Sequence, residues 1–163
     1  MKNIFVKNNN GFTIIEVLIA SFIISLTSLA LMSATTKGIE ISEKSLKQAQ
    51  VNMLIEEGVE AVKTIRDTNW ATIENLNTET IYYLSFDTNN NTWSLGVNPT
   101  NLIDEIFTRQ IIFSNVYRDT NDDIASSGMI DDGVKKVKVI VSWPYGTSVI
   151  SKDIGFYLTN FLN

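Results

Sequence analysis

The apolar residues of this chain are distributed unevenly. Residues 12–36 form an almost uninterrupted apolar run, in which Glu16 is the single charged residue and Ser and Thr are the other polar types. About 20 apolar residues in a helix cross the hydrocarbon core of a bilayer, so this run is long enough to span a membrane. The residues expected to face lipid are Phe12, Ile14, Ile15, Val17, Leu18, Ile19, Phe22, Ile23, Ile24, Leu26, Leu29 and Leu31.

Farther along, the apolar positions become periodic. They recur every three or four residues, at Val51, Leu54, Ile55, Val59, Val62 and Ile65, with Gly58 on the same stripe. This spacing predicts an amphipathic helix with one face to bury. No proline precedes Pro99, so we expect one helix from Phe12 to about Arg66. At about 1.5 Å per residue it measures about 80 Å, with a weak point for a kink at residues 35–38.

After Asn69 the pattern changes to that of strands. Short segments rich in branched and aromatic residues alternate with clusters of Asn, Asp, Gly and Pro; the segments are 81–86, 93–97, 106–117, 134–143 and 149–158. Turns are expected at residues 89–91 and 144–147. Alternation places Val137, Val139 and Val141 on one face of their strand. We therefore predict the α+β class, a long N-terminal helix packed on an antiparallel sheet of four or five strands.

The charges around the apolar run indicate an orientation in the membrane. Residues 1–11 hold Lys2 and Lys7 and no acidic residue, and the next basic residue is Lys37. Positive charge marks the cytoplasmic side, so we expect a single-pass protein with a short cytoplasmic N-terminus and an extracytoplasmic C-terminal head. An ordinary secretory signal is cut after its apolar region, whereas here the polar-to-apolar change comes before that region.

Composition excludes several classes of chemistry. The chain contains no cysteine and no histidine, which removes thiol nucleophiles, disulfides and Cys/His zinc sites. From Lys37 onward there are 11 basic and 17 acidic residues, a net charge of −6. The one dense basic cluster is Lys135, Lys136 and Lys138, and on a strand Lys135 faces away from the other two. Binding to nucleic acid is not expected.

Three further groups suggest sites, and each has a plainer interpretation. Glu56, Glu57 and Glu60 are expected to form a solvated helix face, because nothing else in the sequence completes an acid/base or metal site. Trp70, Trp93, Trp143, Tyr82, Tyr83 and Tyr157 are expected to pack in the core and at its edges, with a ligand-stacking platform as the alternative.

The acidic stretch from Asp119 to Gly133 is the remaining candidate metal site. Asp119, Asn121 and Asp123 are spaced like the start of a calcium loop. Ile124, however, occupies the position of the loop glycine, and Ile130 that of the bidentate glutamate. A mobile acidic loop is therefore the preferred interpretation, and calcium at Asp119, Asn121 and Asp123 is the alternative. No other cofactor is expected.

Glu16 requires an explanation, because placing a carboxylate inside a membrane helix costs roughly a few kcal/mol or more of free energy on insertion scales. The sequence from Gly11 through Phe12-Thr13-Ile14-Ile15-Glu16 to Ala20 resembles the cleavage and methylation motif of type IV prepilins and type II secretion pseudopilins. The basic leader ending in glycine, the phenylalanine after it and the glutamate four residues later all match. The plainer interpretation places Glu16 near the interface, where it reaches water.

The resemblance implies a processing route and a set of partners. Prepilin peptidase would cut between Gly11 and Phe12 and methylate the new amino terminus of Phe12. Glu16 would then face the amine of a neighbouring subunit and set the register of assembly, since a buried carboxylate is tolerated beside a cation. The implied layout is a leader at 1–11, an assembly helix at 12–36, its amphipathic continuation at 37–68, and a head at 69–163.

Two departures from the motif family narrow this interpretation. Many major pilins carry a proline about twenty residues into the mature chain, where Ser33 stands here, and a C-terminal disulfide, which this chain lacks. Both favour a minor pilin or pseudopilin that is a structural subunit and no enzyme. Its partners would be prepilin peptidase, other subunits, an inner-membrane assembly platform and the bilayer. The alternatives are a membrane-anchored binding module without filament assembly and an anchored exported enzyme.

Overall fold

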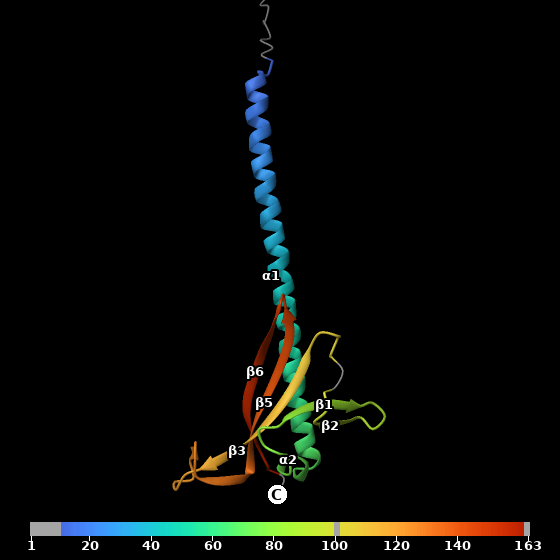
Figure 1. The fold of residues 1–163 in the computed structure, drawn as a ribbon, viewed down its shortest axis with the longest axis vertical. Coiled ribbons are helices and arrows are strands. Elements are labelled where there is room, and N and C mark those ends of the chain that lie inside the picture. Colours follow the sequence, from blue (N-terminus) through green and yellow to red (C-terminus); the bar gives the residue numbers. More distant parts are fainter. Residues whose placement is uncertain (1–10, 100–101, 162–163) are drawn as a thin grey trace, which may run out of the picture. The chain divides into compact units, whose positions relative to one another are not determined.

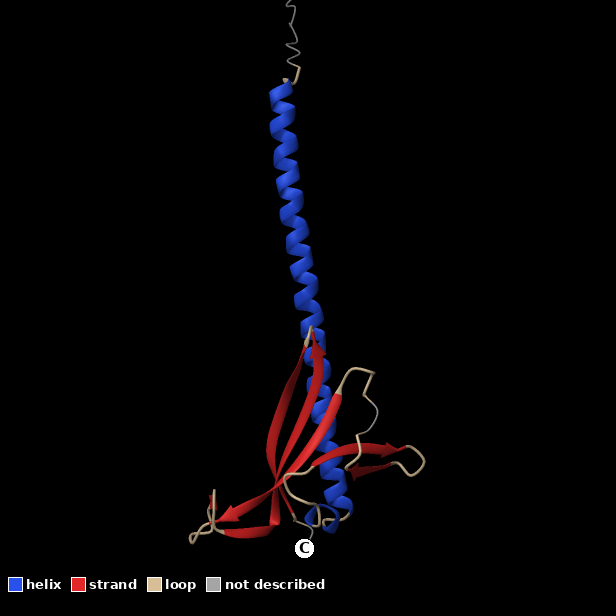
Figure 2. Ribbon diagram, in the orientation of Figure 1, coloured by secondary structure: helices blue, strands red, loops and turns tan. Residues whose placement is uncertain are grey.

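The computed structural model describes residues 11–99 and 102–161. The chain divides into two units, Met1–Leu46 and Lys47–Asn163. In the described part of the first unit, the residues from Ile14 onward are helical and all of them are exposed. The second unit contains the rest of the helix and the sheet, whose strands are coloured red in Figure 2.

Helix α1 runs from Ile14 to Thr68 without interruption. The weak point expected at residues 35–38 does not break it, and Gly38 keeps its helical conformation although glycine has a low helix propensity. The buried positions of α1 are Val51, Ile55, Gly58, Ala61, Val62 and Ile65. Leu54 and Val59, which were predicted on the same stripe, are partly buried at its margins. The predicted amphipathic face is therefore confirmed, and Ala61 is a further buried residue that the predicted stripe did not include.

A short helix, α2, covers Ala71–Glu74 and leads into the sheet. The strands are β1 (Ile81–Asp87), β2 (Thr92–Gly96), β3 (Thr108–Arg118), β4 (Ile124–Ala125), β5 (Met129–Tyr145) and β6 (Ser148–Thr159). Neighbouring strands lie in the order β2-β1-β3-β5-β6, with β4 paired to β3, and every pairing is antiparallel (Figure 1). The predicted α+β class is confirmed, with a sheet of six strands rather than four or five.

The largest difference from the predicted strands is in β5. This strand begins at Met129, five residues before the predicted start, and so includes Asp131, Asp132 and Gly133. These residues were expected in a mobile acidic loop. They are instead in a strand because Met129 and Ile130 pair with Arg118 and Tyr117, past an irregularity in register between Asn115 and Tyr117.

The apolar core has two parts along the helix. Val51 and Ile55 pack with Phe107, Val141 and Trp143. Farther along α1, Ala61, Val62 and Ile65 pack with Ile73, Tyr82, Leu84, Ile111, Phe113, Val137, Val139 and Leu158. The alternation predicted for β5 is confirmed, because Val137, Val139 and Val141 are fully buried whereas Lys136 and Lys138 are exposed.

Gly58 allows α1 to lie close to the sheet. A Cβ atom at this position would come within 2.9 Å of Val139 Cγ1 and 3.1 Å of Arg109 Cδ. Both approaches are closer than ordinary van der Waals contact. Glycine is therefore favoured here although it lowers helix propensity.

Candidate functional site

The N-terminal segment begins just before α1. The carbonyl oxygen of Thr13 accepts hydrogen bonds from the backbone N–H groups of Glu16 (3.1 Å) and Val17 (3.2 Å), and Thr13 Oγ1 accepts one from Glu16 N (3.4 Å). Thr13 is thus the N-cap of the helix. The predicted start at Phe12 is two residues early, and the Gly11–Phe12 bond lies outside α1. Phe12 itself is 83% exposed.

Glu16 occupies the first turn of α1. The spacing from Thr13 to Glu16 is that of a capping box, in which the glutamate carboxylate would accept a hydrogen bond from the N-cap N–H. That reciprocal bond is not formed. Within residues 11–99 and 102–161, the Glu16 carboxylate has neither a hydrogen bond nor an ion pair. The carboxylate is consequently free for a partner outside the described chain.

The apolar part of α1 meets the length and composition of a membrane-crossing helix. Its most apolar stretch is long enough to cross a bilayer core, and none of that stretch is buried. The predicted lipid-facing residues from Ile14 to Leu31 are all more than half exposed. An apolar surface of this kind on all sides of a helix requires a covering that the described chain does not supply.

Six hydroxyl groups of the same segment are satisfied by carbonyl oxygens of the preceding turn. Ser25 Oγ donates to Ser21 O (2.8 Å) and Ser28 Oγ donates to Ile24 O (2.8 Å). The side chains that bond the preceding turn in this way are Ser21, Ser25, Thr27, Ser28, Thr35 and Thr36. These hydroxyls therefore add little cost in an apolar surrounding. Glu16 differs from them in having no such bond.

In the head, the acidic face of α1 is not wholly solvated as predicted. Glu57 Oε2 accepts a hydrogen bond from Arg109 Nη1 at 2.8 Å, and the same nitrogen donates to Leu54 O at 3.1 Å. The Arg109 side chain is only 5% exposed. Glu57 therefore compensates a buried cation from β3. Its partner, 52 residues away, has no signal in the local sequence pattern.

The three clustered lysines do not all lie on the same face of the sheet. Lys135 is buried and donates from Nζ to Asn115 Oδ1 at 2.9 Å, whereas Lys138 is exposed and pairs with Asp153 at 3.3 Å. Lys135 does face away from the other two, as its place on the strand predicts. Two of the three charges thus have partners within the protein.

Carboxylates of the acidic stretch accept hydrogen bonds from backbone N–H groups of the same stretch and from one arginine. Asp119 Oδ1 accepts from Asn121 N (2.8 Å) and Asp123 N (3.0 Å). Arg118 Nε donates to Asp131 Oδ2 at 2.8 Å, and this hydrogen bond raises the pKa of Arg118. Within the part of the chain that the structure describes, no group of three His, Cys, Asp or Glu residues could hold a metal ion. Calcium at Asp119, Asn121 and Asp123 remains an alternative from the sequence alone.

The aromatic residues lie in several places. Tyr82 and Trp143 are buried in the core, as expected, and Tyr157 is 50% exposed. Trp93 packs on Phe86 with ring centroids 4.9 Å apart. The six predicted aromatic residues do not share one surface, and among the described residues Trp93 is the one of the six that stands beside both a second aromatic ring and a cation.

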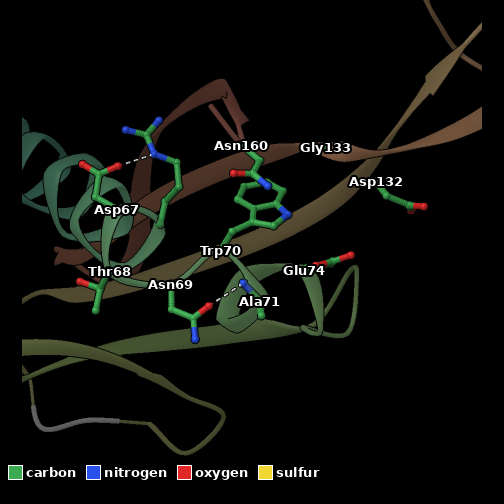
Figure 3. A pocket seen from close by; sticks show the side chains of 10 residues that line it. Asp67, Thr68, Asn69, Trp70, Ala71, Glu74, Asp132, Gly133 and Asn160 are labelled. Carbon is green, nitrogen blue, oxygen red and sulfur yellow. Dashed lines mark hydrogen bonds and ion pairs between the residues drawn. The ribbon is translucent and has the colours of Figure 1, made fainter. Parts of the chain in front are cut away.

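A cavity of about 500 Å³ lies beside the C-terminal end of α1 (Figure 3). Its polar groups are largely engaged locally, since Arg66 Nε donates to Asp67 Oδ1 (2.7 Å) and Ala71 N donates to Asn69 Oδ1 (3.0 Å). The Arg66 guanidinium also lies 4.2 Å from the ring centroid of Phe161. The lining has no nucleophile beside a base, so we assign it no chemistry.

Comparison with known protein families finds a match in the N-terminal part of the chain. Residues 6–32 match the family model described as the prokaryotic N-terminal methylation motif. No curated protein and no solved structure matches the chain. The matched range includes Gly11, Phe12 and Glu16, the residues on which the sequence resemblance rests.

The motif and the structure bear on the same segment. The motif implies a precursor that is processed by prepilin peptidase and has other pilin subunits as partners, and it points to a structural subunit rather than an enzyme. The apolar helix supports anchoring in a membrane. The chain carries a prokaryotic N-terminal methylation motif that extends into a long apolar helix, and is in these respects consistent with a type IV pilin-like protein.

Proposed function

We propose that this chain is the precursor of a minor pilin or pseudopilin, which prepilin peptidase cuts between Gly11 and Phe12. The mature chain would then assemble into a filament through its N-terminal helix. The observation that carries the proposal is Glu16, which lies inside the matched motif and has no partner among the described residues.

Among the described residues, the first part of α1 has neither a covering for its apolar surface nor a partner for the Glu16 carboxylate. Its apolar side chains are exposed all around, so before assembly they would be covered by lipid and after assembly by the helices of other subunits. A lone carboxylate in such a setting costs about 3 kcal/mol or more. The methylated amine of Phe12 from a neighbouring subunit would remove that cost and select one axial register.

The proposal assigns a role to each part of the chain. Residues 1–11 are the cytoplasmic leader, 12–36 the membrane and assembly helix, 37–68 its amphipathic continuation, and 69–163 the extracytoplasmic head. The precursor resides in the cytoplasmic membrane, where an assembly platform receives it, and the mature subunit resides in the filament. Ser33 in place of proline and the lack of cysteine favour a minor subunit or pseudopilin over a major fibre subunit.

The test is the mass and N-terminal sequence of the full chain coexpressed with a prepilin peptidase. We expect a mature chain that begins at methylated Phe12. A Gly11→Ala variant should remain uncut, while Gly38→Ala, a glycine outside the motif, should be processed normally. An uncut wild-type chain, or one cut after Thr36, would contradict the proposal and favour a membrane-anchored binding module.

A further inference from the structure

A small hollow of about 250 Å³ lies on the head beside β4. Its lining includes Ser114, Tyr117, Ile124, Ser126, Lys136 and Tyr157. The volume is below the roughly 300–1,000 Å³ of pockets for drug-sized ligands, so the hollow admits one side chain or one small ring. Among the described residues of the lining, Lys136 is the single charged one. The hollow is therefore a positively charged place in a chain whose residues from Lys37 onward have a net charge of −6.

Three of the lining side chains stand in one row across the sheet. Lys136 on β5 lies directly opposite Ser114 on β3 and Tyr157 on β6. Residues that are opposite each other in antiparallel strands point to the same face of the sheet. The next residue, Val137, is fully buried in the core that packs on α1, so the row lies on the other face. The row thus presents one ammonium group and two hydroxyl groups to the hollow.

Lys136 differs from the two lysines beside it. Lys135 and Lys138 have partners within the head, as described above. The Lys136 ammonium has neither a hydrogen bond nor an ion pair with another described residue, and the hydroxyl groups of Ser114 and Tyr157 have no hydrogen-bond partner there either. All three polar groups of the row are therefore available to a ligand.

The charge balance selects the type of ligand. One ammonium group compensates one negative charge, and a carboxylate carries one charge on two oxygens that can accept from the ammonium and from a hydroxyl together. A phosphate monoester carries about −1.5 to −2 at pH 7 and would leave negative charge uncompensated. The Tyr157 and Ile124 side chains, 50% and 49% exposed, offer apolar surface to the carbon skeleton of the ligand. The lining therefore fits a small organic carboxylate better than an inorganic or phosphorylated anion.

We infer that this hollow binds the carboxylate of a small organic group, with Lys136 as its counter-ion and the hydroxyl groups of Ser114 and Tyr157 as hydrogen-bond donors. An acidic sugar and an acidic amino-acid side chain both supply this chemistry. The inference gives the head a binding function beyond assembly. It does not depend on cleavage at Gly11, so its failure leaves the proposed filament function untouched.

The test uses the full chain in nanodiscs of a zwitterionic lipid, with the side-chain NMR signals of Lys136 and Tyr157 as the readout. The probes are glucuronate and N-acetyl-glutamic acid α-amide, and their uncharged counterparts are glucose and N-acetyl-glutamine α-amide. We expect saturable shifts of both signals with at least one carboxylate, with a Kd in the millimolar range, and binding at least tenfold weaker for its uncharged counterpart. The carboxylate that binds more tightly identifies the source of the group. The absence of saturable shifts with either carboxylate, equal binding of the uncharged counterparts, or tighter binding of inorganic phosphate would overturn the inference.

Lysine variants separate a specific site from general attraction of anions. Lys136→Gln should weaken binding at least tenfold, whereas Lys136→Arg, which keeps the charge, should retain it. Lys138→Gln is the matched control, because it removes the same charge from the same face of β5 and should leave the affinity within about twofold. Both lysines are exposed, so neither change is expected to unfold the head. Unchanged binding in Lys136→Gln, or an equal loss in Lys136→Gln and Lys138→Gln, would contradict the assignment of the site.

Discussion

The two parts of helix α1 have the same secondary structure and opposite surroundings. From Ile14 to Leu46 every residue is exposed, whereas from Val51 onward one stripe is buried against the sheet. Up to Thr36 the first part has apolar residues on all sides and no preferred face, and charged residues follow from Lys37 to Lys44. The second has apolar residues at a spacing of three to four and therefore buries one side. Helix propensity alone does not separate them, but the arrangement of apolar positions does.

The contrast between the exposed and the packed part of α1 is tested most directly by substituting Glu16. Glu16→Gln removes the charge that would pair with a neighbouring amine while keeping the size of the side chain. We expect incorporation into filaments to fall at least tenfold while the thermal unfolding of the head stays unchanged, because Glu16 has no partner in the described chain. Immunoblotting of sheared filaments measures the first effect. Glu40→Gln, outside the apolar span, is the matched control, and equal incorporation of both variants would refute the role of Glu16.

Phe113 tests the other side of the contrast. It is fully buried and contacts the Tyr82 ring edge-on, with centroids 5.9 Å apart. Phe113→Ala should lower the free energy of unfolding of the head by about 3–5 kcal/mol, from lost burial and the cavity left behind. Urea unfolding in detergent, followed by near-UV circular dichroism, measures it.

The control for Phe113 is Phe22→Ala, because Phe22 is 63% exposed. This change should leave the unfolding of the head unaltered. If the two substitutions destabilised the head equally, the division between an unsupported apolar helix and a packed head would be wrong.

Two glycines of the same helix provide a smaller and closely matched comparison. A Cβ atom at Gly58 would lie 2.9 Å from Val139 Cγ1, whereas one at Gly38 would meet nothing within 4 Å. Gly58→Ala should destabilise the head by about 1–3 kcal/mol through overpacking. Gly38→Ala should not, and the same urea titration compares them. A neutral Gly58→Ala would show that the helix and sheet separate without cost.

The smallest expected effect is a pH dependence at the β1–β2 hairpin. The pKa of Asp87 is lowered chiefly by the hydrogen bond from the Asn89 backbone N–H (2.9 Å), then by Asn90 Nδ2 (2.7 Å). Because the folded pKa lies below the unfolded value of about 3.9, the stabilisation is complete above that value. It is lost as the pH falls through the folded pKa.

Comparing the wild type with Asp87→Asn measures this contribution. The wild type should unfold at a higher urea concentration at about pH 6, well above the unfolded pKa, and the difference should shrink at about pH 2. A difference that is the same at both pH values would contradict the role of the Asp87 carboxylate in the turn.

Much of the fold was predictable because its signals are local. The stripe from Val51 to Ile65, the alternation at Val137, Val139 and Val141, and the change to strand-forming sequence after Asn69 are each written in neighbouring residues. The motif around Gly11, Phe12 and Glu16 is likewise a short continuous segment.

Other features could not be found in this way, because they depend on strand pairing. Met129 to Gly133 form the beginning of β5, since Met129 and Ile130 meet Arg118 and Tyr117 across the sheet. Lys135 is buried because Asn115 lies beside it to accept its hydrogen bond. A cluster of acids or lysines in the sequence therefore indicates charge without indicating exposure.

By itself the sequence determined that the chain has a long apolar helix with a processing motif, an amphipathic continuation and a strand-rich remainder, because apolar periodicity and short motifs are properties of adjacent residues. Only the tertiary structure decided that Glu57 compensates the buried Arg109 and that Lys135 is buried beside Asn115. These contacts join residues far apart in the chain, and their geometry is fixed by the register of the sheet against the helix.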